Sequence, residues 1–236
     1  MLVKTRGIVL NFIRYRETSI IARVYTEQLG LQTYIVNSVR KKGPAMRIAL
    51  FQPLTLLEMV VYKSGSGGIT RISEYKCAHP FQTLHYDIRK SSVALFLSEI
   101  ISASVKEEEE NPPLFNFLYQ SIAAFDEMQT GYENFHLTFL LQLAHYLGFG
   151  AANATEITNQ VAFAAPTGLG SQPSVMHFQT FESLLDALMN DPKHAVIPNG
   201  KMRKELLHIL IRFYQLHVDR LGEIKSLHVL SDVLSD

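Results

Sequence analysis

A single cysteine stands in this chain of 236 residues, and no hydrophobic run is long enough to cross a membrane. Cys77 alone cannot form an intramolecular disulfide, and no Cys-x-x-Cys pair is present to hold zinc. The two most apolar stretches, 93–105 and 137–150, are short and interrupted by polar side chains, so buried helices explain them better than a bilayer. Residues 1–6 lack the apolar core of a signal peptide. We therefore expect a soluble protein of the reducing cytoplasm.

Recognisable catalytic motifs are lacking as well. The chain has neither a Gly-x-Ser-x-Gly nucleophile elbow nor a His-Glu-x-x-His zinc motif. The glycine-rich run 65–68 lacks the Lys and Ser/Thr that a phosphate-binding loop requires. Glu205 and His208 have the spacing of half a di-iron site, but the second half is missing. The acidic run 107–110 suits a solvated linker better than a metal site. We therefore expect no catalytic residue, no cofactor and no enzymatic activity.

The formal net charge is zero, but the two signs are unevenly distributed. Residues 1–80 hold 12 Lys/Arg and 4 Asp/Glu, whereas residues 81–236 hold 10 Lys/Arg and 18 Asp/Glu. A division this clean indicates two units that face different partners. The positive excess of the first part suits a polyanion, because phosphate contacts release condensed counterions and supply much of the affinity for nucleic acid. The alternative is that the basic side chains merely solvate that part of the protein.

The first part of the chain has the period of β-strands. Its β-branched and aromatic residues alternate between turn signals and predict five short strands, at 7–13, 18–26, 32–39, 54–62 and 69–75. No crossover is long enough for a βαβ unit, so the strands suit a small antiparallel barrel. An oligonucleotide-binding (OB) barrel and an SH3-like barrel have similar strand counts. A short helix expected at 45–51, between the third and fourth strands, favours the OB type.

After His79-Pro80 the period becomes helical. Helices are expected at 84–105, 114–128, 135–147, 181–189, 202–218 and 226–234, with a loop over 161–175. The predicted fold class is therefore α+β in two domains. Residues 1–80 form a five-stranded antiparallel OB-type barrel for nucleic acid, and residues 81–236 form an all-α domain for docking partners.

The strongest local signal is Arg40-Lys41-Lys42-Gly43, with Arg47 shortly after it. Such a cluster on a loop binds backbone phosphates without selecting bases. A second group of candidate residues lies near the connection between the first two strands. Cations alternate there with aromatic rings, a pattern that suits single-stranded nucleic acid because bases stack on rings while cations hold the backbone. Tyr25 and Tyr34 belong to that pattern, although either ring could instead lie in the barrel core. The candidate DNA contacts are Arg6, Arg14, Tyr15, Arg16, Arg23, Arg40, Lys41, Lys42 and Arg47.

An ordered set of short motifs resembles one bacterial family. The motifs are Thr5-Arg6-Gly7-Ile8-Val9-Leu10, Tyr15-Arg16-Glu17-Thr18-Ser19, Tyr25-Thr26-Glu27-Gln28-Leu29-Gly30, Val39-Arg40-Lys41-Lys42-Gly43, Phe51-Gln52-Pro53-Leu54 and, in the closing helices, 214–229. Together they resemble the RecO family of DNA repair and recombination mediators, in its Bacteroidetes type. The resemblance covers nearly the whole chain, and the ordered set is far more specific than any one piece.

The resemblance implies an OB domain on a helical domain, without enzymatic activity. It implies binding to single- and double-stranded DNA, annealing of complementary strands and an association with the nucleoid. It also implies that the protein acts together with RecR. The two proteins would help RecA to displace single-strand DNA-binding protein from DNA during recombinational repair.

Proteins of that family also dock the acidic, hydrophobic C-terminal tail of single-strand DNA-binding protein on their helical domain. Lys201, Arg203 and Lys204 form the densest basic patch of the acidic part of this chain, as an acidic peptide would need. Cations at the start of a helix oppose its dipole, so stability alone does not explain the cluster. The alternative is a solvated first turn of the helix.

One departure from the family concerns zinc. Some relatives hold zinc with four cysteines in the region that corresponds to 148–175, and this chain has no Cys there. His177 has no companion ligand in that stretch, and a structural zinc site needs about four ligands. We expect no metal, with packing in its place.

Two other functions stay open on the residues alone: another OB-fold adaptor that binds RNA or single-stranded DNA, and a protein–protein scaffold with an incidental barrel charge.

Overall fold

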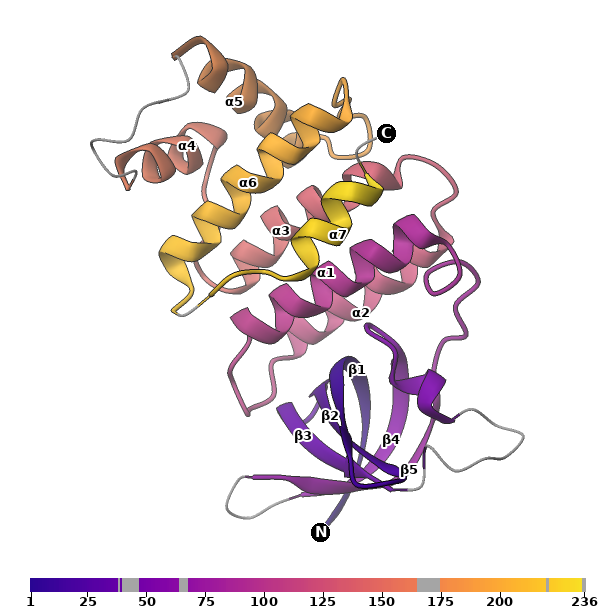
Figure 1. Cartoon of the computed structure of the whole chain (residues 1–236). Helices are drawn as coiled ribbons and strands as arrows, with labels where there is room; N and C mark the ends of the chain where they lie inside the picture. The colour runs from indigo at the N-terminus through magenta and orange to yellow at the C-terminus, as the bar shows by residue number, and fades with distance from the viewer. Residues whose placement is uncertain (38, 40–46, 64–67, 165–174, 220, 235–236) are drawn as a thin grey trace. The chain divides into compact units, whose positions relative to one another are not determined.

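The computed structural model describes residues 1–37, 39, 47–63, 68–164, 175–219 and 221–234, with the backbone alone for 175–178. The chain divides into two compact units, Met1–Glu127 and Met128–Asp236. Each unit is described by itself below, with the element labels of Figure 1.

The first unit begins with a closed β-barrel. Its strands are β1 Leu2–Tyr15, β2 Ser19–Thr26, β3 Gly30–Val36, β4 Leu56–Tyr62 and β5 Thr70–Cys77. They close in the order β1-β2-β3-β5-β4, and a 3₁₀ helix, η1 (Arg47–Phe51), follows β3. This confirms the predicted OB-type barrel.

The prediction that the barrel is wholly antiparallel was wrong for one pair of strands. β3 and β5 are parallel, with Tyr34 opposite Thr70 and Ile35 opposite Arg71. The reason is geometric: an odd number of strands cannot close into a ring with every neighbouring pair antiparallel. The sheet is therefore mixed and mostly antiparallel.

β1 serves two neighbours and bends between them. Its first half pairs with β4 and its second half with β2, and the register shifts between Val9 and Asn11, as at a β-bulge. Gly7 lies before this bend, where a Cβ atom would come closer than 3.0 Å to side-chain atoms of Met59 and Val24. The glycine therefore lets β1 pass close to the barrel interior.

The barrel core holds both tyrosines whose place the sequence left open. Tyr34 is fully buried in the core, and Tyr25 is fully buried with its ring 6.1 Å from that of Phe115. Burial raises the pKa of Tyr25 to about 12, with a contribution from the charge of Glu107, and burial also raises the pKa of Tyr34. Both rings therefore contribute to packing and are not available for stacking on bases.

Two helices complete the first unit, α1 (Ile88–Ser104) and α2 (Pro112–Glu127). They lie over one end of the barrel, and α1 packs against β1 (Figure 1). The change from strands to helices falls between Cys77 and Ile88. Internal contacts nevertheless group both helices with the barrel, so the division at residue 80 remains a prediction about domains.

A buried carboxylate fixes the connection from the barrel to α1. Asp126, near the end of α2, is 1 % exposed and accepts hydrogen bonds from the backbone N–H groups of three successive residues, 82–84, at 2.7–2.8 Å. The ammonium of Lys90 is also buried and donates to Thr83 Oγ1 and to the backbone oxygen of Asp126. These bonds tie α2, α1 and the connecting segment together.

The acidic run 107–110 also lies against the barrel. Leu31 N donates to Glu107 O at 2.9 Å, beside the turn from β2 to β3. Gly30 occupies this turn with φ +61°, and a Cβ atom there would come closer than 3.0 Å to the backbone of Glu107 and Glu109. The segment from α1 to α2 is thus held by its backbone while its carboxylates are exposed.

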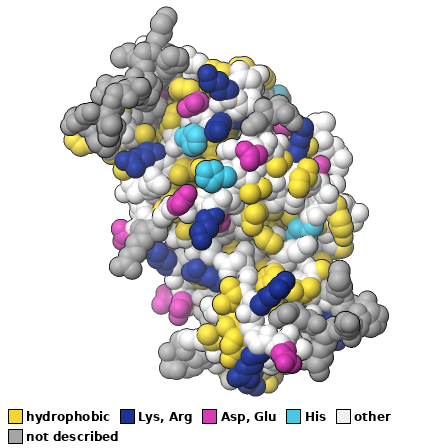
Figure 2. Space-filling model, viewed as in Figure 1, with side chains coloured by type: hydrophobic (Ala, Val, Ile, Leu, Met, Phe, Trp, Pro, Cys, Tyr) yellow, Lys and Arg dark blue, Asp and Glu magenta, His cyan; other side chains and the backbone are white. Residues whose placement is uncertain are grey.

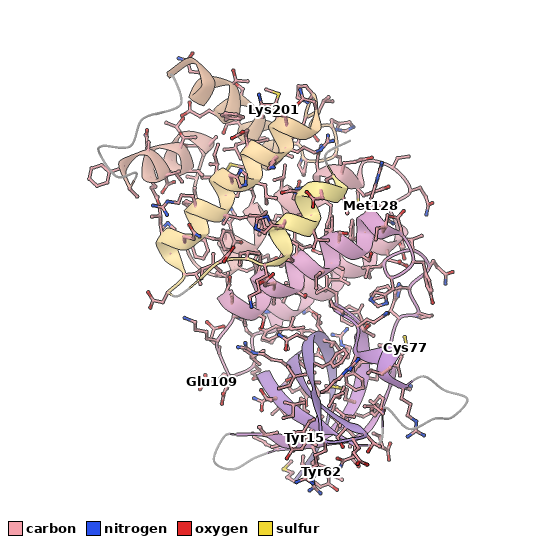
Figure 3. The ribbon with its side chains drawn as sticks, in the orientation of Figure 1. Tyr15, Tyr62, Cys77, Glu109, Met128 and Lys201 are labelled. Carbon is pink, nitrogen blue, oxygen red and sulfur yellow. The ribbon has the colours of Figure 1, made fainter. Side chains whose placement is uncertain are left out.

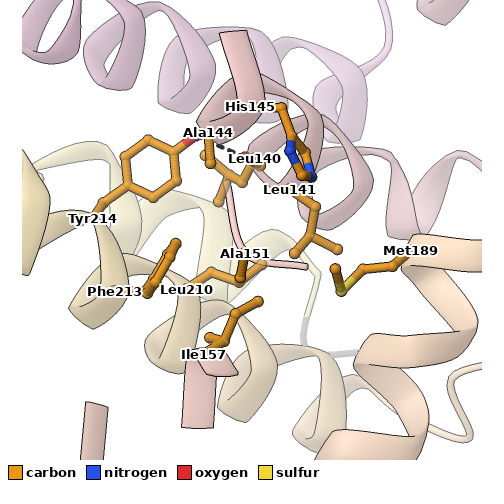
Figure 4. A pocket seen from close by; sticks show the side chains of 10 residues that line it. All are labelled: Leu140, Leu141, Ala144, His145, Ala151, Ile157, Met189, Leu210, Phe213 and Tyr214. Carbon is orange, nitrogen blue, oxygen red and sulfur yellow. Dashed lines mark hydrogen bonds between the residues drawn. The ribbon is translucent and has the colours of Figure 1, made fainter. Parts of the chain in front are cut away.

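The second unit consists of helices α3 Phe135–Tyr146, α4 Ala154–Phe163, α5 Val175–Asn190, α6 Gly200–His217 and α7 Ser226–Val233, with the short η2 (Tyr132–Asn134). α6 packs against α3 and α4. Figure 4 shows an apolar gap among these helices, beside which the Tyr214 hydroxyl donates to Leu140 O at 2.7 Å. The gap has no room for a water molecule. In the described part of the chain, no helix is long and apolar enough to cross a membrane.

α4 was missed by the sequence pattern, and α5 begins six residues before the helix expected at 181. α4 has only 10 residues, and its start is fixed by partners distant in sequence as well as by the Asn153 cap. Ala154 N donates to Asp186 Oδ1, and Thr158 Oγ1 donates to Glu182. A helix this short depends on such tertiary contacts, which periodicity does not reveal.

Candidate nucleic-acid interface

The outer face of β1, β2 and β3 carries a continuous strip of side chains. Side chains alternate along a strand, and Ala22 and Val24 belong to the barrel core, so Arg23 between them points outward. Ile13 shares this face and is 62 % exposed, unusual for isoleucine. The register places three outward rows across the strands: Asn11–Arg23–Thr33, Ile13–Ile21–Ile35 and Tyr15–Ser19. We call these residues the outer strip.

β5 extends the outer strip through its parallel pair with β3. The exposed Arg71 lies opposite Ile35 and so continues the row of isoleucines with a cation. The sequence did not single out Arg71, because nothing in a run of strands says that the fifth lies beside the third. Only the closed strand order brings this cation to the face of β2 and β3, the face with which OB barrels bind oligonucleotides.

Three predicted contacts meet at the turn from β1 to β2. Arg14 and Arg16 are exposed, and the guanidinium of Arg16 lies 5.2 Å from the centroid of the Tyr15 ring. Arg16 has φ 51°, in the left-handed region that few residues other than glycine adopt. Figure 3 shows Tyr15 at the end of the barrel away from α1 and α2. This turn presents two cations and a ring together, and we call it the Arg14–Arg16 turn.

Arg23 lies farther along the outer strip, where α1 approaches the barrel. Its guanidinium is half-buried and donates to Ser102 Oγ at 3.0 Å, and Asn11 Nδ2 donates to the same oxygen at 3.2 Å. Burial lowers the pKa of Arg23. Sequence reasoning found Arg23 but missed Asn11 and Ser102, because the hydroxyl comes from a helix 79 residues later in the chain.

Arg6 is engaged by other residues of the protein, Glu27 and Tyr119. Its guanidinium forms a bidentate ion pair with Glu27, with a shortest N–O distance of 2.7 Å, and lies 4.7 Å from the ring centroid of Tyr119 on α2. The hydrogen bond to Glu27 raises the pKa of Arg6 and lowers that of Glu27, and burial opposes both shifts. A DNA contact by Arg6 remains a prediction, and this side chain already joins β1 to α2.

Arg47 is placed by η1 and not by the strands of the outer strip. Arg47 is exposed at the start of η1. Burial raises the pKa of Tyr75 on β5 and the charge of Arg47 opposes that shift, so Arg47 lies near Tyr75. The predicted cluster of Arg40, Lys41 and Lys42 lies outside the described residues, so its role stays a prediction.

The predicted docking cluster of the second unit divides between a pocket and open surface. Arg203 and Lys204, in the first turns of α6, line a pocket whose apolar walls are Leu207, Leu230 and Leu234. Lys201, labelled in Figure 3, is exposed and does not line it. On the face of the helical unit seen in Figure 2, Lys and Arg stand among Asp and Glu, so the acidic excess forms no continuous acidic surface there.

Arg203 has an electrostatic effect inside that pocket. Its Nε is buried and has no hydrogen-bond partner among the described residues. Burial, together with the charge of Arg203, lowers the pKa of the fully buried His136 to about 3, so this imidazole is neutral at physiological pH. The positive charge at this pocket therefore comes from Arg203 and Lys204 alone among its lining residues.

Residues 148–164, the described part of the region for which the sequence predicts no zinc site, contact α5 and α6. Within the described residues, no three His, Cys, Asp or Glu side chains gather as metal ligands would, and the side chain of His177 lies outside that part. The ring of Phe149 instead stacks on His217, with centroids 4.9 Å apart and planes 4° apart. Together with the bonds from α4 to Asp186 and Glu182, this stacking joins α4, α5 and α6.

A closed five-stranded barrel of this topology, with cations and a ring on the face that OB barrels use to bind oligonucleotides, defines an OB-fold protein with an added helical unit. Residues 1–81 match the family "Recombination protein O N terminal", and residues 85–156 match "Recombination protein O C terminal". Full-length relatives have the name "DNA repair protein RecO". That of Flavobacterium psychrophilum is 36% identical over 100% of both chains, and that of Bacteroides fragilis is 35% identical over 99% of both. The chain therefore belongs to the RecO family of DNA repair and recombination proteins.

Proposed function

We propose that this chain is a recombination mediator that binds DNA strands on its barrel and anneals complementary strands. With RecR it helps to load RecA onto DNA coated with single-strand DNA-binding protein. The chemistry consists of binding and release, because annealing needs phosphates neutralised and bases presented without any covalent bond being broken. The proposal therefore assigns no catalytic residue and no cofactor.

One observation carries the proposal: the outer strip and the Arg14–Arg16 turn lie on adjoining parts of one barrel. Asn11 and Tyr15 are four residues apart on β1, a span of about 13 Å. A strand of DNA along this span would meet Arg16 and Tyr15, then the exposed Ile13, then Arg23. Cations that follow the backbone beside apolar surface for the bases suit single strands of any sequence.

Salt dependence of binding to a dT oligonucleotide tests the role of this face. Replacing Arg14 and Arg16 by Ala removes two expected phosphate contacts, so the slope of log affinity against log salt should fall by about 1.4, at about 0.7 per contact. Fluorescence anisotropy at several salt concentrations measures both the slope and the affinity. An RNA oligonucleotide of the corresponding sequence, measured in parallel, separates a DNA mediator from an RNA-binding adaptor.

The matched control removes two cations from another face of the barrel. Lys4 and Lys76 both lie near Glu58, and Lys76 forms an ion pair with it at 2.8 Å. Replacing these two lysines by Ala makes the same change of net charge and should leave the slope nearly unchanged. Equal losses in both double variants would show that only the overall charge matters, which contradicts the proposed face. Annealing of coated strands by a variant with Arg40, Lys41 and Lys42 changed to Ala tests the basic loop separately.

We propose further that the helical unit docks the acidic, hydrophobic tail of single-strand DNA-binding protein. The pocket beside Arg203 supports this proposal. Leu207, Leu230 and Leu234 offer apolar walls for the tail's hydrophobic end. Arg203 and Lys204 offer positive charge beside these walls, and the guanidinium of Arg203 can pair with a carboxylate.

A synthetic peptide of that tail tests the pocket. The Arg203→Ala variant should bind the peptide at least about ten-fold more weakly, because a charge-assisted hydrogen bond contributes about 1.5–3 kcal/mol. Lys193→Ala, which removes an exposed cation elsewhere in the same unit, should bind normally. Isothermal titration calorimetry gives both affinities, and equal affinity of wild type and Arg203→Ala would exclude this pocket as the docking site.

A further inference from the structure

The outer strip ends in a pocket that the binding of phosphates alone does not require. The pocket lies between the barrel and α1, encloses about 390 Å³ and is open to solvent. Its walls are largely apolar and include Leu10, Pro53, Leu95 and Ala103. Leu95 is 42 % exposed, so this wall faces outward on α1. A volume of this size with a few polar groups is typical of small-ligand sites.

The polar groups converge at one side of this pocket. Arg23, Asn11 and Ser102 are joined there by two hydrogen bonds to the serine hydroxyl, and the carboxylate of Glu99 lines the same pocket. A guanidinium has five N–H donors, and Arg23 uses one of them on Ser102, so donors remain for an incoming acceptor. The neutral hydroxyl offsets only part of the loss of hydration that burial imposes on the charge.

We propose that this pocket takes up a single nucleobase, preferably guanine, from the strand bound along the outer strip. Arg23 donates to the acceptors O6 and N7 of the base, and Glu99 accepts from its N1–H and amino group. The apolar walls cover the faces of the ring. The inference rests on the proposed function, since it assumes that single-stranded DNA crosses this face of the barrel.

The combination of groups favours a base over a phosphate. A phosphate would meet the carboxylate of Glu99 and lose most of its hydration against apolar walls, both of which are unfavourable. Guanine presents two adjacent acceptors that match the fork of an arginine, the most common base-specific contact of proteins with DNA. Unstacked bases of single strands are commonly recognised along such edges.

Four dT oligonucleotides that differ only at a central position, dT, dA, dC or dG, test the inference by fluorescence anisotropy. Wild type should bind the dG strand at least about five-fold more tightly than the all-dT strand, the lower range for one bidentate base contact. Arg23→Lys keeps the charge but not the fork, so it should bind all four strands within about two-fold of one another. Its affinity for all-dT should stay within about three-fold of wild type.

Arg89→Lys is the matched control, because it makes the same exchange on α1, outside the pocket and the outer strip, and should keep the preference for dG. Glu99→Gln gives a second test, with a preference that falls at least about two-fold while binding to all-dT persists. Thermal melting checks that each variant is folded.

The outcomes separate this inference from the proposed function. If wild type binds all four strands equally, the base pocket is wrong and the mediator proposal stands. If wild type does not bind even all-dT at low salt, the mediator proposal itself fails. A preference for dG that survives Arg23→Lys would place base recognition elsewhere. A variant that binds DNA normally but no longer binds RecR would make the pocket a protein-docking site, and would overturn the inference.

Discussion

Replacing Asp126 by Asn is expected to destabilise the first unit by about 3–5 kcal/mol, the range for breaking a buried charged network from one side. The carboxylate accepts three backbone N–H bonds from residues 82–84 and one from the hydroxyl of Thr83. An amide has one acceptor oxygen, and its NH₂ group would face donors. The buried ammonium of Lys90 would also lose the favourable charge of Asp126, which raises its pKa against the effect of burial. Urea unfolding followed by circular dichroism measures the loss.

The exposed Glu74 provides the control, because Glu74→Gln makes the same change of charge without a buried partner and should shift stability by less than about 0.5 kcal/mol. A difference below about 1 kcal/mol between the two variants would contradict the role given to Asp126.

The pH dependence of stability gives an independent measure of this carboxylate. Burial alone would raise the pKa of Asp126, but hydrogen bonds from the backbone of residues 82–84 outweigh burial and hold the pKa below its ordinary value. A depressed pKa stabilises the folded state above the unfolded value of about 3.9, and the contribution is lost as the pH falls through the folded value. Wild type should therefore lose stability below about pH 4 more steeply than Asp126→Asn. Parallel curves for the two proteins would contradict this assignment.

Replacing Gly30 by Val is expected to destabilise the same unit by about 2–4 kcal/mol, through backbone strain and steric overlap together. The backbone at Gly30 has φ +61°, which a β-branched residue adopts only with strain. The added side chain would also meet the backbone of Glu107 and Glu109 and displace it. The amide of Leu31, whose partner is Glu107 O, should then exchange its hydrogen much faster than in wild type.

Gly131→Val separates the strain from the overlap. Gly131 also has a left-handed backbone, with φ +75°, but a Cβ atom there meets nothing within 4 Å. This control should therefore show the strain alone, about 1–2 kcal/mol. Equal losses at the two positions would mean that the contact between the acidic run and the barrel contributes nothing to stability.

The barrel was predictable because each of its strands carries its own local pattern. Alternation and turn residues identify strands without reference to distant partners. Four of the observed strands lie close to the expected ranges, whereas β1 begins five residues before the strand expected at 7–13. The parallel pair of β3 and β5 was not predictable from the pattern, since it is a property of closure. α4 was missed for a related reason: its start depends on Asp186 and Glu182, which lie in α5.

The candidate site was predictable to a smaller degree. Arg14, Tyr15 and Arg16 are adjacent in sequence, so their grouping at a turn needed only the strand boundaries. Arg6 has the same local signature of a cation in a strand, yet Glu27 and α2 already engage it. Residue type alone did not distinguish these cases, because availability depends on what packs over each strand.

The grouping of α1 and α2 with the barrel bears on how the chain folds during synthesis. Residues up to Cys77 contain every strand, so the barrel can close soon after they leave the ribosome. At that stage Phe115, which packs on Tyr25, has not yet been synthesised. Asp126, which accepts hydrogen bonds from the segment 82–84, follows that segment by more than 40 residues. A nascent chain stalled between these points would present an uncovered apolar surface to chaperones and to other chains.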